Sequence, residues 1–174
     1  ADNLGLESVK LLASTYAELV VGQTKEVQFS FDTKHGTDDY LEVIGGKTAS
    51  LIRTSAKLGA MASNSSPGLI ESISSWAWHS GIIFQITDDI LDLNSDTETL
   101  GKPAGNDILE GTYTLPVLLA LEKDRIKIED ILHQVKNSEI ELVEVLREFN
   151  NDEIVEESNK SVSYTHLRAH ETRI

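Results

Sequence analysis

The chain has 174 residues, of which 40% are hydrophobic and none is cysteine, a composition typical of a globular protein without disulfide or thiol chemistry. Its formal charge of −14 argues against a nucleic-acid-binding protein, because such proteins need a basic surface to bind phosphates. No apolar run reaches the ~18 residues of a membrane helix and no secretory signal pattern opens the chain, so a cytoplasmic protein without a membrane anchor is the expectation.

Helical spacing of apolar residues dominates the first half of the chain. The spacing predicts a helix over about 6–31. A second helix is predicted over about 38–62, with Thr37 as its N-cap. Pro67 suits the first turn of a third helix, which we expect to extend to about residue 93.

The second half of the chain begins with the glycine-rich stretch 100–111, which lacks periodicity and is predicted to be a functional loop. Helices are predicted to resume over about 114–121, 127–135 and 139–149. Since no segment alternates with a strand period, the prediction is an all-α fold. Residues 161–174 turn from acidic to basic and resemble a non-native tail, so the domain is predicted to span 1–160.

Three carboxylates, those of Asp88, Asp89 and Asp92, lie in the third predicted helix within an apolar stretch. Residues three and four apart share one side of a helix, so these side chains are expected to project together. Grouped negative charges beside apolar residues are costly unless a cation neutralises them, and carboxylates combined with substrate phosphates suit Mg²⁺. The run predicts a metal-bound phosphate or diphosphate site. A solvated acidic patch at the end of an amphipathic helix is the alternative.

Two lysines have neighbours that suit a phosphate ligand. Lys47 follows two glycines and precedes Thr48, which places a cation beside a hydroxyl donor. Lys102 lies between glycines, just after the aspartate-rich helix. The alternatives are a surface lysine packed on its helix for Lys47 and an ordinary mobile loop for Lys102.

A second acidic pair, Asp38 and Asp39, also has the outline of a metal motif. It lies at a predicted helix start, where the helix dipole favours acidic side chains. We therefore interpret this pair as a structural feature of the helix start and assign no metal to it.

Blocks of this sequence resemble the trans-isoprenyl diphosphate synthases in order and spacing. The matching blocks are 45–49 (Gly-Gly-Lys-Thr-Ala), 84–92 with the three aspartates, 101–107 and 114–116. The resemblance covers roughly Leu6 to Lys160 and points to the bacterial medium- and long-chain polyprenyl synthases that make quinone side chains. It implies an all-α bundle of long helices around a central cavity, incomplete here on the N-terminal side.

The resemblance implies a prenyltransferase that joins an allylic diphosphate to isopentenyl diphosphate, with Mg²⁺ assisting the loss of diphosphate. Asp88, Asp89 and Asp92 match the family's second aspartate-rich motif, which binds that Mg²⁺. Lys47 and Lys102 match lysines that bind the allylic diphosphate.

Four further residues match family positions around the reacting carbons. Thr48 and Gln85 match residues near the reacting carbons, where family members stabilise developing positive charge and help to guide proton loss. Together with Lys47 they form the predicted catalytic set. Gln23 and Glu26 match a Gln and an acidic position that face the substrate cavity, where aspartate is commoner than the glutamate found here.

One part of the family pattern has no counterpart in this chain. The first aspartate-rich motif and the isopentenyl-binding lysine, arginine and histidine lie upstream in the family, and nothing before Gly45 matches them. The chain is therefore expected to be the C-terminal half of a synthase, inactive alone, with a product length that the sequence does not reveal.

Family members commonly form dimers, so a homodimer is expected, and an isolated half is expected to expose apolar faces and to aggregate. Two alternatives to a catalytic half remain open. One is a non-catalytic partner subunit of a heteromeric prenyl diphosphate synthase. The other is a purely structural helical interaction module, which predicts no dependence on metal.

Overall fold

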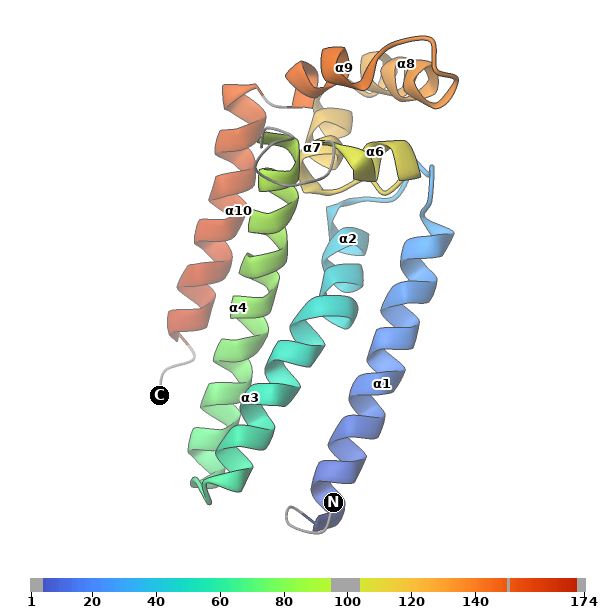
Figure 1. Cartoon of the computed structure of the whole chain (residues 1–174). Helices are drawn as coiled ribbons and strands as arrows, with labels where there is room; N and C mark the ends of the chain where they lie inside the picture. The colour runs from blue at the N-terminus through green and yellow to red at the C-terminus, as the bar shows by residue number, and fades with distance from the viewer. Residues whose placement is uncertain (1–4, 95–103, 150, 172–174) are drawn as a thin grey trace. The chain divides into compact units, whose positions relative to one another are not determined.

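The structure is a computed structural model of the chain that describes residues 5–94, 104–149 and 151–171. Every regular element among these residues is a helix, which confirms the all-α prediction (Figure 1). None of the described helices is both long enough and apolar enough to cross a membrane. The elements are α1 (Gly5–Gln28), α2 (Thr37–Ile44), the π-helix η1 (Gly45–Ala49), α3 (Ser50–Ala62), α4 (Pro67–Asn94), α6 (Asn106–Glu110), α7 (Leu115–Lys123), α8 (Arg125–Lys136), α9 (Leu142–Phe149) and α10 (Asp152–Glu171).

The described residues fall into two compact units, and both contain buried apolar side chains. Unit 1 holds the described parts of 1–25, 41–85 and 163–174, and unit 2 holds those of 26–40 and 86–162. Most of α1, all of η1 and α3, and the first part of α4 therefore belong to unit 1. The end of α4 belongs to unit 2 together with α6 to α9.

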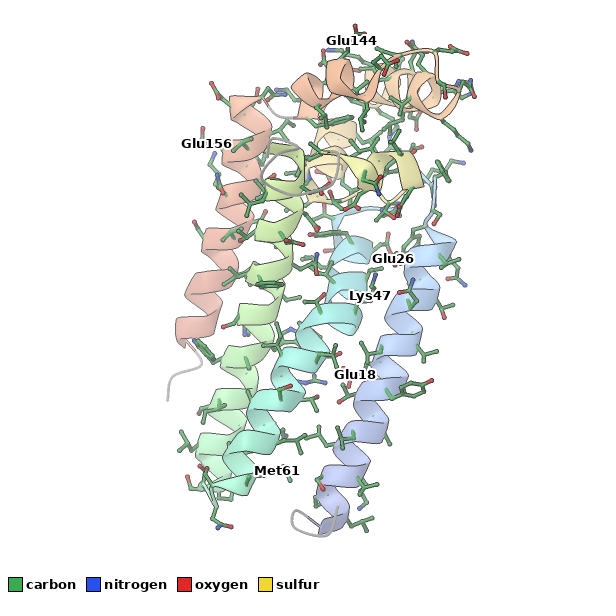
Figure 2. All side chains as sticks on the ribbon, in the orientation of Figure 1. Glu18, Glu26, Lys47, Met61, Glu144 and Glu156 are labelled. Carbon is green, nitrogen blue, oxygen red and sulfur yellow. The ribbon has the colours of Figure 1, made fainter. Side chains whose placement is uncertain are left out.

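A polar seam joins α1 to α3 in unit 1. The hydroxyls of Thr15 and Thr54 are hydrogen-bonded at 2.6 Å and buried. Nearer the C-terminal end of α1, both carboxylate oxygens of Glu18 accept from Nη2 of Arg53, at 2.7 and 2.8 Å. Figure 2 shows Glu18 between the two helices. Charge-assisted bonds of this kind fix the register of neighbouring helices as well as their contact.

The apolar side chains of α1 lie largely on its exposed side, because the seam uses the polar side. Tyr16 is 70% exposed and Leu6 is 66% exposed. Exposed residues recur with the 3–4 spacing of one helix face and carry no charge: Leu6, Val9, Ala13, Tyr16, Val20 and Gln23. An apolar face of this extent is typical of a surface that another protein segment covers.

The predicted second helix is interrupted by η1, a π-helical turn between α2 and α3. The amide of Ser50 donates to the carbonyl of Gly45, five residues back, and the Ser50 hydroxyl donates to the carbonyl of Gly46 at 2.6 Å. The serine side chain thus satisfies a carbonyl that the altered ladder would leave without its usual donor. Such turns inside α-helices occur frequently at functional sites.

Unit 2 is built around α7, whose apolar side chains are almost completely buried. Leu115, Val117, Leu118 and Leu121 are each at most 2% exposed. The helices α8 and α9 pack on α7, and their buried residues include Ile128, Leu132, Val145 and Phe149. This core corresponds to the helices predicted over 114–149, with helix ends shifted by a few residues.

The connection between α1 and α2 is bound closely to the helices of unit 2. Phe31 has a left-handed backbone, with φ of 59°, and its amide donates to the Gly111 carbonyl at 2.9 Å. The Thr33 hydroxyl donates to Glu129, and Arg125 donates to the Thr33 carbonyl. These bonds fix the segment that leads into α2.

Besides η1, two elements differ from the sequence-based prediction. The short helix α6 lies within the stretch 100–111 that was predicted to be a loop, and it is flanked by Gly105 and Gly111, both in the left-handed conformation. The helix α10 was not predicted, and it continues to Glu171, across the start of the tail expected at 161. The non-native origin of residues 161–174 stays a prediction.

Candidate functional site

Lys47 and Thr48 lie on η1, where glycines allow close backbone packing against α1. A Cβ atom on Gly46 would lie 2.9 Å from the Glu18 carbonyl oxygen, and one on Gly22 would lie 3.0 Å from the Lys47 amide nitrogen. Only glycine permits two helix backbones to approach so closely. Gly46, the second glycine of the Gly-Gly-Lys-Thr block, thus packs η1 directly against Gly22 and Glu18 of α1.

A third glycine seats η1 on α4. A Cβ atom on Gly81 would lie 2.6 Å from the Cα of Ala49, closer than any ordinary contact. The π-helical turn is therefore held between two helices by backbone contact. These contacts fix the backbone positions from which the side chains of the turn extend. Lys47 and Thr48 are both half-buried in this position.

Thr48 and Gln85 are brought together in unit 1. The Thr48 hydroxyl donates to Gln85 Oε1 at 2.6 Å, and both side chains are half-buried. The resemblance placed these two residues near the same reacting carbons, and their direct contact is consistent with that expectation. The hydrogen bond also orients the amide group of Gln85.

The three aspartates of α4 lie in unit 2 and have unequal surroundings. Asp88 is exposed, whereas Asp89 and Asp92 are each 6% exposed. The hydroxyl of Tyr40, itself 5% exposed, donates to Asp89 Oδ2 at 2.6 Å. This length is typical of a hydrogen bond to an ionised carboxylate.

Tyr40 has a pKa well above the ordinary tyrosine value of 10.0. Burial raises this pKa first, and the negative charge of Asp89 and the hydrogen bond to it raise it further. The phenol is therefore a stable proton donor toward Asp89 at neutral pH. Sequence reasoning missed this residue, although a tyrosine in the apolar stripe of a helix needs a partner for its hydroxyl.

The three aspartate carboxylates of α4 do not form a complete metal-binding cage in the structure. Among the described residues, no three Asp, Glu or His side chains converge into a cluster that would hold a metal by itself. Magnesium usually binds one or two carboxylates together with water and substrate phosphates, and does not need a complete protein cage. The donor chemistry of Asp88, Asp89 and Asp92 thus fits a magnesium ion whose coordination a diphosphate completes.

The other predicted substrate-binding residues, Gln23, Glu26 and Lys102, do not lie together in one described part of the structure. Gln23 is exposed in unit 1, and Glu26 is half-buried in unit 2. Lys102 lies outside the described residues. The structure therefore brings Thr48 and Gln85 together beside Lys47 in one unit, whereas the three aspartates lie in the other unit, on α4, without forming a cluster.

The second acidic pair has the structural role expected of it. The carboxylate of Asp39 accepts a hydrogen bond of 2.9 Å from the amide of Gly36, the residue before α2. A side chain in the first turn that bonds back to the preceding amide is half of a capping box. Asp38 is exposed at the same helix start. Thr37, predicted to be the N-cap, is instead the first residue of α2.

An all-α fold with a lysine-threonine pair on a π-helical turn and an aspartate-rich helix defines a helical protein of the isoprenoid synthase type. The family model for polyprenyl synthetase matches residues 2–149, and the chain belongs to that family. A nonaprenyl diphosphate synthase of Mycobacterium tuberculosis is 39% identical over 120 residues, which are 69% of this chain and 36% of that protein.

Solved structures support the same assignment. The heptaprenyl diphosphate synthase of Staphylococcus aureus superposes with a TM-score of 0.84 at 27% identity, over 95% of this chain and 52% of that chain. A geranylgeranyl pyrophosphate synthase of Corynebacterium glutamicum, solved with calcium and isoprenyl diphosphate, has a TM-score of 0.81 at 33% identity, over 98% and 54%. The chain thus spans about half the length of these relatives.

Proposed function

We propose that this chain supplies the allylic-diphosphate half of a trans-polyprenyl diphosphate synthase, a prenyltransferase that extends an allylic diphosphate with isopentenyl diphosphate. One observation carries the proposal. The family model matches residues 2–149, a range that contains Lys47, Thr48, Gln85 and all three aspartates, and Thr48 is hydrogen-bonded to Gln85. Because the chain spans about half the length of its relatives, we propose that catalysis requires the other half of the fold as well.

The proposed reaction breaks the C–O bond of the allylic diphosphate and forms a C–C bond to isopentenyl diphosphate, which then loses a proton. Negative charge develops on the departing diphosphate, and fixed cations stabilise that charge. Lys47 and Lys102 would bind the diphosphate, and Asp88, Asp89 and Asp92 would hold Mg²⁺. The bound Mg²⁺ would stabilise the leaving group as a Lewis acid.

Positive charge develops at the allylic carbon in the same step, and oxygen dipoles stabilise it. Thr48 and Gln85 present oxygen atoms that a hydrogen bond of 2.6 Å holds in one arrangement. Gln23 and Glu26, which match positions that face the cavity in the family, would contact the substrate from α1.

Magnesium, a homodimer and a cytoplasmic location are parts of this proposal. A relative solved with calcium and isoprenyl diphosphate supports a divalent metal, and the oxygen donors of the aspartates favour Mg²⁺. The exposed apolar face of α1 supports a partner that covers it.

The competing proposal is a non-catalytic partner subunit of a heteromeric synthase. Loss of the metal-binding or diphosphate-binding residues would favour it. Asp88, Asp89, Asp92, Lys47 and Lys102 are all present in this chain, which favours a catalytic role.

Reconstitution tests the proposal. The chain is co-expressed with the N-terminal half of the Staphylococcus aureus relative, and the incorporation of labelled isopentenyl diphosphate into longer products is measured with Mg²⁺. Activity that disappears in Asp88→Ala/Asp89→Ala and persists in the control Asp38→Asn supports catalysis. A folded complex whose activity is unaffected by Asp88→Ala/Asp89→Ala would favour the partner-subunit proposal.

A further inference from the structure

The buried hydrogen bond between Tyr40 and Asp89 joins two residues that are 49 positions apart in the chain. A buried tyrosine hydroxyl and a buried carboxylate are each costly to desolvate unless they are paired. Here each compensates the other at 2.6 Å, within unit 2. A phenylalanine would fill the same apolar space, so the hydroxyl is present for its hydrogen bond.

The backbone that carries Tyr40 is held in place by independent contacts. The Tyr40 amide donates to the Gly36 carbonyl at 3.1 Å, and Gly36 in turn donates to Asp39. The Thr37 hydroxyl donates to Glu122 of α7 at 3.0 Å. The position of the Tyr40 backbone is therefore set by the start of α2 and by α7, through contacts that do not involve Asp89.

We propose that Tyr40 is a positioning residue that holds the carboxylate of Asp89 in the orientation needed to bind Mg²⁺. The inference rests on the proposed function, since it takes Asp89 to be a metal ligand. Ligating carboxylates are commonly hydrogen-bonded by an outer group, and loss of that group typically weakens metal binding by about 10–100-fold. The hydroxyl of Tyr40 donates to Oδ2 of Asp89, and a carboxylate has about four lone-pair sites, so this bond is compatible with coordination of a cation by the same group.

The test measures Mn²⁺ binding to the full chain in the presence of inorganic diphosphate, by the electron paramagnetic resonance signal of the free ion. Tyr40→Phe is expected to weaken Mn²⁺ binding by about tenfold or more. The control is Tyr113→Phe, which alters another buried tyrosine of unit 2 and is expected to leave Mn²⁺ affinity unchanged. In an Asp89→Asn background, Tyr40→Phe should have no further effect, because the positioned ligand is already lost.

The outcomes separate the two proposals. If the native chain binds Mn²⁺ in a manner that depends on Asp88 and Asp89, and folded Tyr40→Phe binds it equally well, the positioning role is wrong and the proposed function stands. If the native chain shows no binding that depends on these aspartates, the proposed function fails in this chain and the inference fails with it.

A second measurement covers the case in which Tyr40→Phe does not fold. The chain has four tyrosines, and 3-fluorotyrosine labelling with ¹⁹F NMR assigns the Tyr40 signal by elimination, using Phe variants of the other three. Addition of Mg²⁺ and diphosphate should shift the Tyr40 signal, since the metal draws charge from the carboxylate that accepts its hydrogen bond. An unmoved Tyr40 signal under conditions that saturate the Asp88- and Asp89-dependent site would overturn the inference.

Discussion

The hydroxyl of Thr48 on η1 donates a hydrogen bond of 2.6 Å to Oε1 of Gln85 on α4. The bond ties the π-helical turn to the neighbouring helix at the position where the lysine-threonine pair lies. A hydroxyl donor, that of Thr48, and an amide oxygen acceptor, that of Gln85, therefore lie together in a half-buried part of unit 1.

Thr48→Val removes this hydrogen bond while keeping the side-chain shape. The Gln85 oxygen then loses its donor in a partly desolvated place, so the free energy of unfolding should fall by about 1–2 kcal/mol. Thr48→Ser retains the hydroxyl, so its free energy of unfolding should fall by less than that of Thr48→Val. Urea denaturation checks both variants, and a larger loss of stability in Thr48→Ser than in Thr48→Val would show that the methyl group, and not the hydrogen bond, carries the effect.

Gly81→Ala should destabilise the chain even though alanine is the better helix former. The added Cβ would lie 2.6 Å from the Cα of Ala49, so α4 must move away from η1, at a cost of about 1–3 kcal/mol. The matched control is Gly59→Ala in α3, where nothing lies within 4 Å of the new atom. Gly59→Ala should raise the free energy of unfolding of the chain by about 0.5–1 kcal/mol. Thermal unfolding of the two variants should therefore show changes of opposite sign, and stabilisation by Gly81→Ala would contradict the close packing of α4 on η1.

Glu18→Gln should weaken the seam between α1 and α3. The pair with Arg53 is only partly exposed, and the Arg53 guanidinium also lies 4.9 Å from the Trp78 ring centroid. We expect a loss of about 1 kcal/mol that shrinks at high salt, because screening weakens the native pair. Glu7→Gln, which breaks the exposed pair with Lys10, should change the free energy of unfolding by less than about 0.5 kcal/mol. Equal effects of the two variants would count against a structural role for the seam.

The stability of the chain should decline at high pH through Tyr40. Its folded pKa lies above the unfolded value of about 10, so the folded state holds this proton more tightly. The stabilisation is fully present below about pH 10 and is lost as the pH rises through the folded pKa. The measurement is the free energy of unfolding as a function of pH from neutrality upward, for the native chain and Tyr40→Phe. A native chain that loses no more stability than Tyr40→Phe over this range would contradict the expectation.

Helical periodicity predicted the presence of α1, α3 and α4 but not which side of α1 is buried. Apolar spacing over 6–31 predicted a helix and no particular buried side, and Tyr16 and Leu6 are exposed because Thr15 and Glu18 face α3. The apolar periodicity of α1 indicates only that one face of the helix is apolar. Which face packs against α3 depends on residues of α3 that this periodicity does not include.

Short sequence motifs were sufficient to predict the residues of the diphosphate site. The contacts among these residues could be described only from the structure. The π-helical turn at Gly45–Ala49 depends on close contacts with Gly22 and Gly81, which no local pattern encodes. Tyr40 was missed for a related reason. Its partner Asp89 lies 49 residues away, and nothing in the spacing of either motif links the two.

Calorimetric titration of farnesyl diphosphate into the chain, with and without Mg²⁺, measures whether this half alone binds an allylic diphosphate. We predict binding that requires Mg²⁺, is lost in Asp88→Ala/Asp89→Ala, and persists in Asp38→Asn, which changes an exposed acid at the start of α2. Binding that is indifferent to Mg²⁺ and to both aspartates, or no binding by a chain that circular dichroism shows to be folded, would contradict the claim that this half carries the allylic-diphosphate site.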